Sequence, residues 1–287
     1  MSAFGSVAAT NAELAATGYL ADQRTATAAY LADALQKPLL VEGPAGVGKT
    51  ELAKAVATAL HADLIRLQCY EGLDEARALY EWNYRKQLLR IQASRDPSWE
   101  EAEVDIFGAD FLLERPLLSA IRRTEPTVLL IDEVDKADIE FEALLLEVLS
   151  DFQTTIPELG TIRATRRPFV VLTSNATREL SEALKRRCLY LHLDYPDAAR
   201  EREIVLVRVP EASAEFATKV VRIVRTLRGL GLRKPPSISE TIDWARTLLA
   251  LGIDEVDGTA LTDTLGVLLK NRADQDRAVD ALALRES

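Results

Sequence analysis

The stretch that decides the fold lies near the start of the chain and reads Leu39-Leu40-Val41-Glu42-Gly43-Pro44-Ala45-Gly46-Val47-Gly48-Lys49-Thr50. It opens with a short apolar run, which is typical of a buried strand, and residues 49–60 then repeat apolar side chains at helical spacing. Between the two, residues 43–50 match the G-x-x-x-x-G-K-[ST] pattern of a phosphate-binding loop. This order of strand, loop and helix is the context that the pattern requires. The sequence therefore predicts a turn that binds phosphate groups.

Each residue type in the loop has a separate task. The glycines allow backbone N–H groups to turn inward around a β-phosphate at a helix N-terminus. Lys49 adds a positive charge for the β- and γ-oxygens, and Thr50 offers a hydroxyl to magnesium. We therefore expect ATP and Mg2+ as cofactors, with all of residues 43–50 and the adjacent Glu51 as the binding set. The alternative, a glycine-rich turn without a ligand, is disfavoured by the flanking strand and helix.

Two later strands are expected to end in polar residues that suit hydrolysis. Residues 127–131 form an apolar run followed by Asp132 and Glu133, and residues 169–172 form another that leads to Asn175. Ligands of open α/β sheets bind at the carboxyl ends of the strands. We expect Asp132 to hold the magnesium shell, Glu133 to polarise the attacking water, and Asn175 to bond the γ-phosphate or its water. Alone, the acidic strand end and Asn175 could each be ordinary turn residues.

The alternation of strands and helices predicts an α/β fold. Further helices are expected over residues 22–36 and, after an N-cap at Asp138, as far as Leu149, with strands over residues 63–69 and 189–193. Residues 154–165 read as a hairpin about Gly160. We expect a P-loop NTPase fold, a three-layer αβα sandwich with a parallel five-stranded sheet. Helical periodicity over residues 200–209, 214–227, 239–251 and 261–270 predicts a small all-α lid after it.

The domain limits follow from these patterns. Residues 1–17 form an N-terminal arm, a frayed segment or short helix; residues 18–196 form the nucleotide-binding domain; residues 197–287 form the helical lid. Inside the larger domain, a helix is expected over residues 74–93, ending at Asp96-Pro97. Another is expected over residues 107–122, interrupted near Pro116. Core packing is the preferred reading of the three aromatic side chains in the first of these segments, Tyr80, Trp82 and Tyr84.

Composition narrows the class of protein. The chain has 287 residues, a formal net charge of −10 and a pI near 5.0, which disfavours a protein that grips nucleic acid through phosphate neutralisation. Cys69 and Cys188, with only two histidines, build neither a disulfide framework nor a metal cluster, and we expect two reduced, half-buried thiols. The start of the chain lacks a basic signal segment, and no apolar run reaches membrane-spanning length. We therefore expect a cytoplasmic protein without membrane insertion.

The order of the motifs resembles that of an AAA+ ATPase. The phosphate loop, Asp132-Glu133 and Asn175 are followed by Leu184-Lys185-Arg186-Arg187-Cys188. Within that class the chain resembles the MoxR group and its CoxD-like subgroup. That finer resemblance rests on residues 178–187 (RELSEALKRR), 160–164 (GTIRA) and 234–241 (KPPSISET), and the whole covers about residues 18–270.

The resemblance implies a homo-oligomer, a hexameric ring with ATP at each subunit boundary. Arg186 or Arg187 would reach into the neighbouring site as an arginine finger, although residues 185–187 could instead be a solvated basic face. Tyr19 and Leu20 would lie beside the adenine. The hairpin and the 74–93 helix would be family insertions that face a partner or a central pore. In one departure, no arginine stands between Ser237 and Asp243, which leaves Arg233 or Arg246 as candidate lid sensors.

By family analogy, ring rearrangement would remodel or activate a client in a chaperone-like role. The implied partner is a von Willebrand factor A domain protein, a molybdenum-containing hydroxylase awaiting maturation, or both. One alternative is a nucleic-acid motor or loader, which the acidic charge and the absence of a zinc or helix-turn-helix motif disfavour. Another is a nucleotide-dependent scaffold with little hydrolysis, which Glu133 and Asn175 disfavour.

Overall fold

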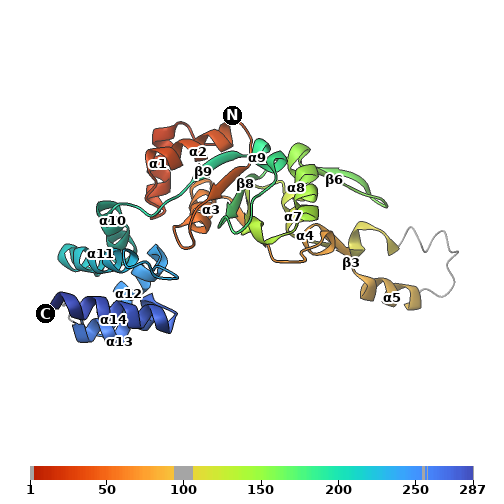
Figure 1. Ribbon diagram of the computed structural model, residues 1–287. Coiled ribbons are helices and arrows are strands. Elements are labelled where there is room, and N and C mark those ends of the chain that lie inside the picture. Colours follow the sequence, from red (N-terminus) through yellow and green to blue (C-terminus); the bar gives the residue numbers. More distant parts are fainter. Residues whose placement is uncertain (1–2, 94–105, 254–255, 257, 287) are drawn as a thin grey trace. The chain divides into compact units, whose positions relative to one another are not determined.

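A parallel sheet forms the centre of the larger part of the molecule (Figure 1). The computed structural model describes residues 3–93, 106–253, 256 and 258–286. The five strands stand in the order β2-β5-β8-β1-β9, and every neighbouring pair is parallel. Their bounds are Leu39–Glu42 for β1, Asp63–Gln68 for β2, Thr127–Asp132 for β5, Phe169–Ser174 for β8 and Leu189–His192 for β9. The predicted α/β fold class is confirmed.

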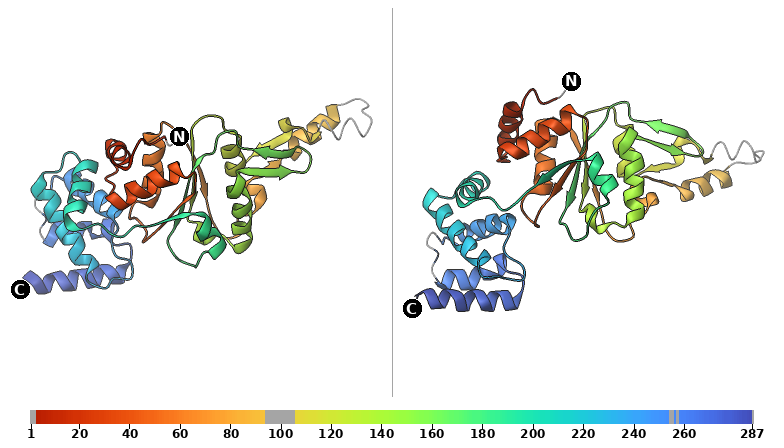
Figure 2. Two further views of the ribbon diagram at one scale, coloured as in Figure 1. Left: turned by 90° about the horizontal axis from the view of Figure 1, so that it is seen from above. Right: turned by 45° about the horizontal axis from the view of Figure 1, so that its top comes forward.

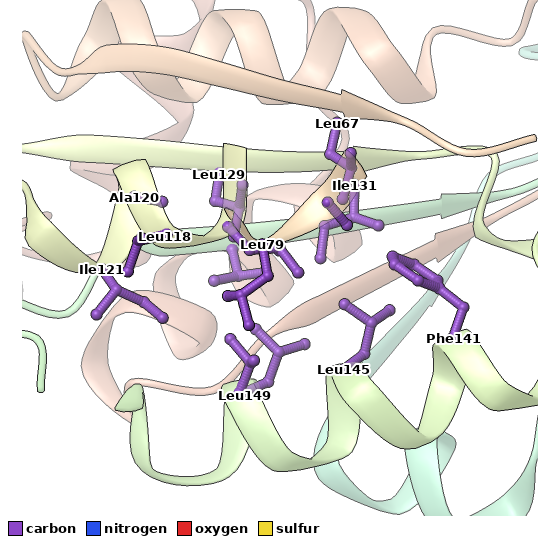
Figure 3. Close-up of a cluster of buried hydrophobic side chains, with 14 of the residues drawn as sticks. Leu67, Leu79, Leu118, Ala120, Ile121, Leu129, Ile131, Phe141, Leu145 and Leu149 are labelled. Atoms are coloured by element: carbon purple, nitrogen blue, oxygen red, sulfur yellow. The ribbon is translucent and has the colours of Figure 1, made fainter. Parts of the chain in front are cut away.

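One face of the sheet is covered by α7 (Pro116–Arg122) and α8 (Ile139–Asp151). Figure 3 shows Phe141, Leu145 and Leu149 of α8 turned toward Leu129 and Ile131 of β5, all within one buried cluster. Side chains four residues apart lie on the same side of a helix, and alternate residues of a strand share one face. The helix begins where the sequence predicts, because the Asp138 carboxylate accepts a hydrogen bond from the Phe141 N–H at 3.0 Å.

Three helices lie on the opposite side of the sheet from α7 and α8 (Figures 1 and 2): α1 (Val7–Ala16), α2 (Gln23–Ala34) and α3 (Lys49–Ala59). Leu52 and Val56 of α3 are fully buried, as their helical spacing predicts. The arm before α1 is tied down, because the Asp33 carboxylate accepts hydrogen bonds from the backbone N–H groups of Ala3 and Phe4. The buried Phe4 ring and these bonds fix the start of the described chain against α2.

The segment between β2 and β5 differs from the prediction of two helices. Residues 75–93 form α4 (Glu75–Ala78), the strand β3 (Tyr80–Trp82) and α5 (Tyr84–Ala93). A short 3-10 helix η1 (Ala109–Phe111) then leads to β4 (Leu112–Glu114), which pairs antiparallel with β3. Pro116 begins α7 rather than interrupting a helix. The break expected at Asp96-Pro97 lies outside the described residues.

The aromatic residues of this segment behave differently from one another. Trp82 is buried and makes an edge-on contact with the Phe107 ring, with centroids 5.3 Å apart, and Tyr80 packs beside it. Tyr84 is 61% exposed, so its predicted place in the core is wrong. Tyr84 opens α5, which projects from the sheet on the side away from α1 and α2 (Figures 1 and 2).

The hairpin predicted before the β8 strand is present, formed by β6 (Gln153–Ile156) and β7 (Gly160–Arg163). Two short helices complete this part of the chain. They are the 3-10 helix η2 (Val134–Lys136), directly after β5, and α9 (Glu182–Arg187), directly before β9.

The rest of the chain is helical, as predicted, and forms a second compact unit. It contains α10 (Ala198–Arg208), α11 (Ala214–Arg228), α12 (Ile238–Ala250), α13 (Gly258–Leu268) and a further helix, α14 (Arg272–Glu286), which the sequence analysis did not predict. By contacts, residues 18–20 and 43–49 belong to this unit. Its core surrounds Trp244, which is fully buried. Within the described ranges, every helix is too short or too polar to cross a membrane.

Candidate active site

The phosphate loop connects β1 to α3, and its lysine is turned inward. The Lys49 ammonium donates hydrogen bonds to the carbonyl oxygens of Gly43, at 2.6 Å, and Pro44, at 2.8 Å. The residue is only 7% exposed. An ammonium offers its donors in several directions, so a lysine held inside the loop can reach a phosphate that enters it. The loop is therefore shaped around a positive charge.

Two glycines of the loop have backbone conformations that favour glycine. Gly46 has φ +75°, and a Cβ there would stand 2.3 Å from the Ser237 side chain, which caps the start of α12. Gly48 has φ +102°, and a Cβ there would contact the Tyr19 ring at 3.6 Å. Side chains rarely adopt such backbone conformations, and the first site has no space for one. Tyr19, predicted to lie beside a bound base, thus lies against the last glycine of the loop.

Asp132, at the carboxyl end of β5, is the most heavily bonded carboxylate of the sheet edge. Its Oδ1 accepts hydrogen bonds from the hydroxyls of Thr50, at 3.1 Å, and Thr173, at 2.5 Å. Its Oδ2 accepts two from the Arg66 guanidinium, from Nη2 at 2.5 Å and Nε at 3.0 Å. The aspartate is almost fully buried, and these hydrogen bonds offset the cost of removing a carboxylate from water. Thr50, which follows Lys49 in the first turn of α3, is thus the residue of that turn that contacts the acid.

Glu133 follows Asp132 in a sharp turn, with φ +57° and ψ +48°. The left-handed conformation is costly for a residue with a side chain and is enriched at functional sites. One carboxylate oxygen faces the Asn175 amide nitrogen at 3.4 Å. The other accepts hydrogen bonds from Gln68, at 2.8 Å, and Lys136, at 2.5 Å. This bond and the glutamate charge raise the pKa of Lys136, which remains charged. The structure thus brings Glu133 and Asn175, two of the predicted site residues, close to one another.

Asp135 fixes the loop that carries Asn175. Its carboxylate accepts hydrogen bonds from the N–H groups of Asn175, at 3.2 Å, and Thr177, at 2.9 Å, and from the Thr177 hydroxyl at 2.6 Å. Burial alone would raise the pKa of Asp135, but these hydrogen bonds outweigh it and lower the pKa. The ionised carboxylate therefore connects the turn after β5 to the turn after β8.

Replacing Asp135 by asparagine is expected to cost about 1–3 kcal/mol of unfolding free energy at pH 7, because an amide cannot accept all of these bonds. A carboxylate with a lowered pKa stabilises the fold above its unfolded pKa of ~3.9. That contribution is lost as the pH falls through the lower, folded pKa. The difference in unfolding free energy between wild type and variant should therefore disappear in acid. Urea unfolding at pH 7 and below pH ~3.9 measures it. Asp151→Asn, at an exposed carboxylate, is the control, and an equal gap at both pH values would contradict the assignment.

Magnesium fits this edge of the sheet only with help from a phosphate. The described residues contain no group of three or more His, Cys, Asp or Glu side chains that could hold a metal ion. In phosphate sites, Mg2+ takes one or two protein ligands and completes its shell with water and phosphate oxygens. Thr50 and Asp132 suit that role, because a hydroxyl that donates to the carboxylate keeps its lone pairs for a metal.

The two cysteines take no part in this chemistry. Both are free and buried, more deeply than the half-buried state we expected. Burial raises the pKa of each thiol to about 12, and the nearby acids, Asp132 foremost, add to the effect at Cys69. Thiols with such a pKa are protonated near neutral pH and are poor nucleophiles.

The candidate arginines at the end of α9 have different surroundings. Arg187 donates hydrogen bonds to the Leu146 carbonyl oxygen and the Ser150 hydroxyl, both on α8. Arg186 is exposed and has no hydrogen bond or ion pair within the part of the chain that the structure describes. Lys185 pairs with Glu179 at 3.2 Å.

The candidate lid sensors lie in the helical unit. Arg246 donates to the Arg208 carbonyl oxygen at 3.0 Å and lies 4.0 Å from Asp243, so its head is engaged within the lid. Arg233 is exposed, and its backbone N–H donates to the Asp274 carboxylate at 2.9 Å. Neither observation assigns a sensor.

Several residues of the site were missed by the sequence analysis. Arg66 and Gln68 come from β2, and Gln68 lies opposite Asp132 in the sheet register. Their positions depend on the pairing of β2 with β5, which the sequence does not state. A usable signal exists, because both polar side chains fall on one face of the strand and its carboxyl end reaches the same sheet edge. Thr173 follows the apolar run of β8 and could have been included by the same argument.

Comparisons with known proteins agree with this geometry. A family model, described as the ATPase family associated with various cellular activities (AAA), matches residues 39–193. An uncharacterised protein of Staphylococcus haemolyticus is 25% identical over 224 residues, 76% of this chain and 77% of that protein. Chaperone protein ClpB 2 of Parasynechococcus marenigrum is 37% identical over 133 residues, but these make up 46% of this chain and only 13% of that protein.

Solved structures with the same fold include single-residue variants of RuvB from Thermotoga maritima. One has a TM-score of 0.51 at 18% identity, covering 86% of this chain and 68% of that one. Another has a TM-score of 0.50 at the same identity, covering 88% of this chain and 69% of that one. Identity at this level shows a common fold and carries no information about substrate.

Proposed function

Because the chain belongs to the AAA family of ATPases, we propose that it binds Mg2+ and ATP at the phosphate loop and hydrolyses ATP to ADP and phosphate. The observation that supports this best is the sheet edge. There, Asp132 contacts the Thr50 hydroxyl, and the next residue, Glu133, faces Asn175. An acid for the metal shell and an acid for the water are the groups that phosphoryl transfer to water requires.

The residues divide the work as follows. The loop N–H groups and Lys49 hold the β- and γ-phosphates, and Thr50 and Asp132 hold the magnesium shell. When bound, the metal ion neutralises charge on the phosphate oxygens. Glu133 accepts a proton from the water molecule. As it does so, the water oxygen forms a bond to the γ-phosphorus, and the bond between that phosphorus and the ADP oxygen breaks. Asn175 orients that water or the γ-phosphate. Tyr19, Leu20 and Glu51 complete the nucleotide site.

The finer assignment is to the MoxR group and its CoxD-like subgroup. It is supported by the segments 160–164, 178–187 and 234–241, and residues 160–163 form the second strand of the β6–β7 hairpin. In this reading the chain acts as a homo-oligomeric ring, with Arg186 or Arg187 completing the site of a neighbouring subunit. The exposure of both arginines at the end of α9 supports such a role.

The function of the ring would be chaperone-like, to remodel, mature or activate a protein partner. Similarity to a protein named as a chaperone supports this class of role. The partner is a von Willebrand factor A domain protein, a molybdenum hydroxylase, or both. Adding such a purified protein should change ATP turnover at a fixed ring concentration. Constant turnover across a panel of such proteins would remove the partner from the proposal and leave hydrolysis untouched.

Turnover per subunit should rise with protein concentration as rings assemble, because the finger comes from a neighbour. The double variant R186A/R187A should bind ATP normally, yet its turnover should be about a thousandfold lower and independent of concentration. Phosphate release over a concentration series, with molecular mass measured alongside, checks this. Lys185→Ala, in the adjacent ion pair, is the matched control and should keep full turnover. Wild-type turnover by the double variant would exclude both arginines.

A further inference from the structure

The residue with the least expected role at the sheet edge is Arg66. It lies on β2, two residues before Gln68, and its guanidinium reaches along the strand to Asp132. Nη2 and Nε both donate to Asp132 Oδ2, at 2.5 and 3.0 Å, and Nη2 also donates to the Gln68 side chain. Arg66 therefore supplies the positive charge for a carboxylate whose side chain is only 4% exposed.

Both oxygens of the Asp132 carboxylate accept hydrogen bonds in this arrangement. Oδ1 accepts them from the hydroxyls of Thr50 and Thr173. A buried carboxylate without a cation would pay a large desolvation cost, and the arginine removes that cost. The acid is therefore satisfied, in charge and in hydrogen bonds, by the protein alone.

The same carboxylate is the acid that suits the magnesium shell, and this creates a competition. A guanidinium and a hydrated divalent cation repel each other, and both require the Asp132 oxygen as acceptor. The Thr50 hydroxyl lies 3.4 Å from Oδ2, the oxygen that accepts from Arg66, so a metal shell beside Thr50 competes with the arginine for that oxygen. Thr50 meets no such conflict, because its lone pairs stay available while its hydroxyl donates to the carboxylate.

Arg66 can be displaced from Asp132 at small cost to its own hydration. Its side chain is 52% exposed, so its charge can return to water at small cost while its stem stays along β2. The Asp132 end of the pair is buried and needs a cation beside it, but the arginine end is already open to water and can be exchanged for another cation. The ion pair of Arg228 and Glu201 in the helical unit differs, because its side chains are only 12% and 0% exposed. Both ends of that pair are shielded from water, so it is harder to exchange.

We propose that Arg66 is a stand-in cation, which neutralises Asp132 in the nucleotide-free protein and is displaced by the magnesium that arrives with the nucleotide. This inference rests on the proposed nucleotide site. It makes Arg66 a positioning residue that sets how tightly the metal is held. Metal binding then includes the work of breaking an arginine–aspartate pair, so removing the arginine should strengthen it.

The test measures Mn2+ binding to protein saturated with ADP, by the electron paramagnetic resonance signal of free Mn2+. Arg66→Gln should bind Mn2+ about two- to fivefold more tightly than wild type, the size expected when one ion pair with an exposed arginine no longer has to be broken. Arg66→Lys keeps the charge but loses the two-atom contact, so its affinity should fall between the two. Arg123→Gln removes an arginine that pairs with Asp63 of the same strand and should match wild type.

Thermal unfolding supplies a second readout. Without nucleotide and metal, Arg66→Gln should melt below wild type, and saturating Mn2+ and ADP should narrow that difference. Folded Arg66 variants that bind Mn2+ no more tightly than wild type would overturn the role of Arg66 while leaving the nucleotide site intact. If wild type itself bound no Mn2+ with ADP, the proposed function would be lost together with this inference.

Discussion

Replacing Glu133 by glutamine is expected to reduce ATP turnover by about 10²–10⁴-fold while ATP binding stays near its wild-type level. Glutamine keeps the shape of the side chain and a hydrogen bond toward Asn175, but it cannot accept a proton from water. The substitution does not alter the backbone at position 133, where φ is +57°, so the turn should be retained. The phosphate loop, Lys49 and Asp132 are unchanged in this variant, so we expect nucleotide affinity to be retained. Phosphate release and nucleotide titration together measure the two effects.

The control for this variant is Glu140→Gln, which changes an exposed acid in the first turn of α8. It removes the same charge from the same region without touching the sheet edge, so turnover should be unaffected. Hydrolysis by Glu133→Gln at the wild-type rate would remove Glu133 from its role. Loss of binding in that variant would instead indicate that Glu133 holds the nucleotide rather than the water.

Replacing Lys49 by alanine is expected to weaken nucleotide binding itself severely. The ammonium is enclosed by the loop, where it is 7% exposed and donates to the carbonyl oxygens of Gly43 and Pro44. Charged hydrogen bonds of this kind are worth about 1.5–3 kcal/mol each. The alanine variant lacks such bonds to the β- and γ-phosphates, so its nucleotide affinity should be at least about a hundredfold weaker. Titration with a fluorescent ADP analogue measures the change.

Lys37→Ala is the matched control, because Lys37 is exposed and lies at the opposite end of β1 from the loop. It should bind nucleotide as wild type does. The circular dichroism spectrum of Lys49→Ala must match that of wild type for the result to concern binding. A folded Lys49→Ala protein that binds nucleotide normally would contradict the phosphate-loop assignment.

Much of the sheet and its polar edge could be predicted from the sequence, because the signals there are local. Residues 39–50 contain strand, loop and helix within one short stretch, and the apolar run of β5 is directly followed by Asp132 and Glu133. A fully buried parallel strand has no polar face to confuse the pattern. The same reasoning located Asn175 one residue beyond β8.

What could not be predicted depends on partners distant in sequence. Tyr80 and Trp82 belong to a longer stretch whose apolar spacing also fits a helix, and residues 80–82 become a strand only because residues 112–114 pair with them. Strand preference is a matter of such context rather than of the residues themselves. Arg66 was missed for the same reason, since its contact with Asp132 spans 66 positions.

The central claim is that one triphosphate and one metal ion meet at the phosphate loop and the end of β5. The most direct test is an experimentally determined structure of the Glu133→Gln variant with Mg2+ and ATP. We expect the phosphates inside residues 43–50, with the metal ion between the Thr50 hydroxyl and the Asp132 side of the sheet edge. Nucleotide bound elsewhere, or a metal ion remote from Thr50 and Asp132, would contradict the account.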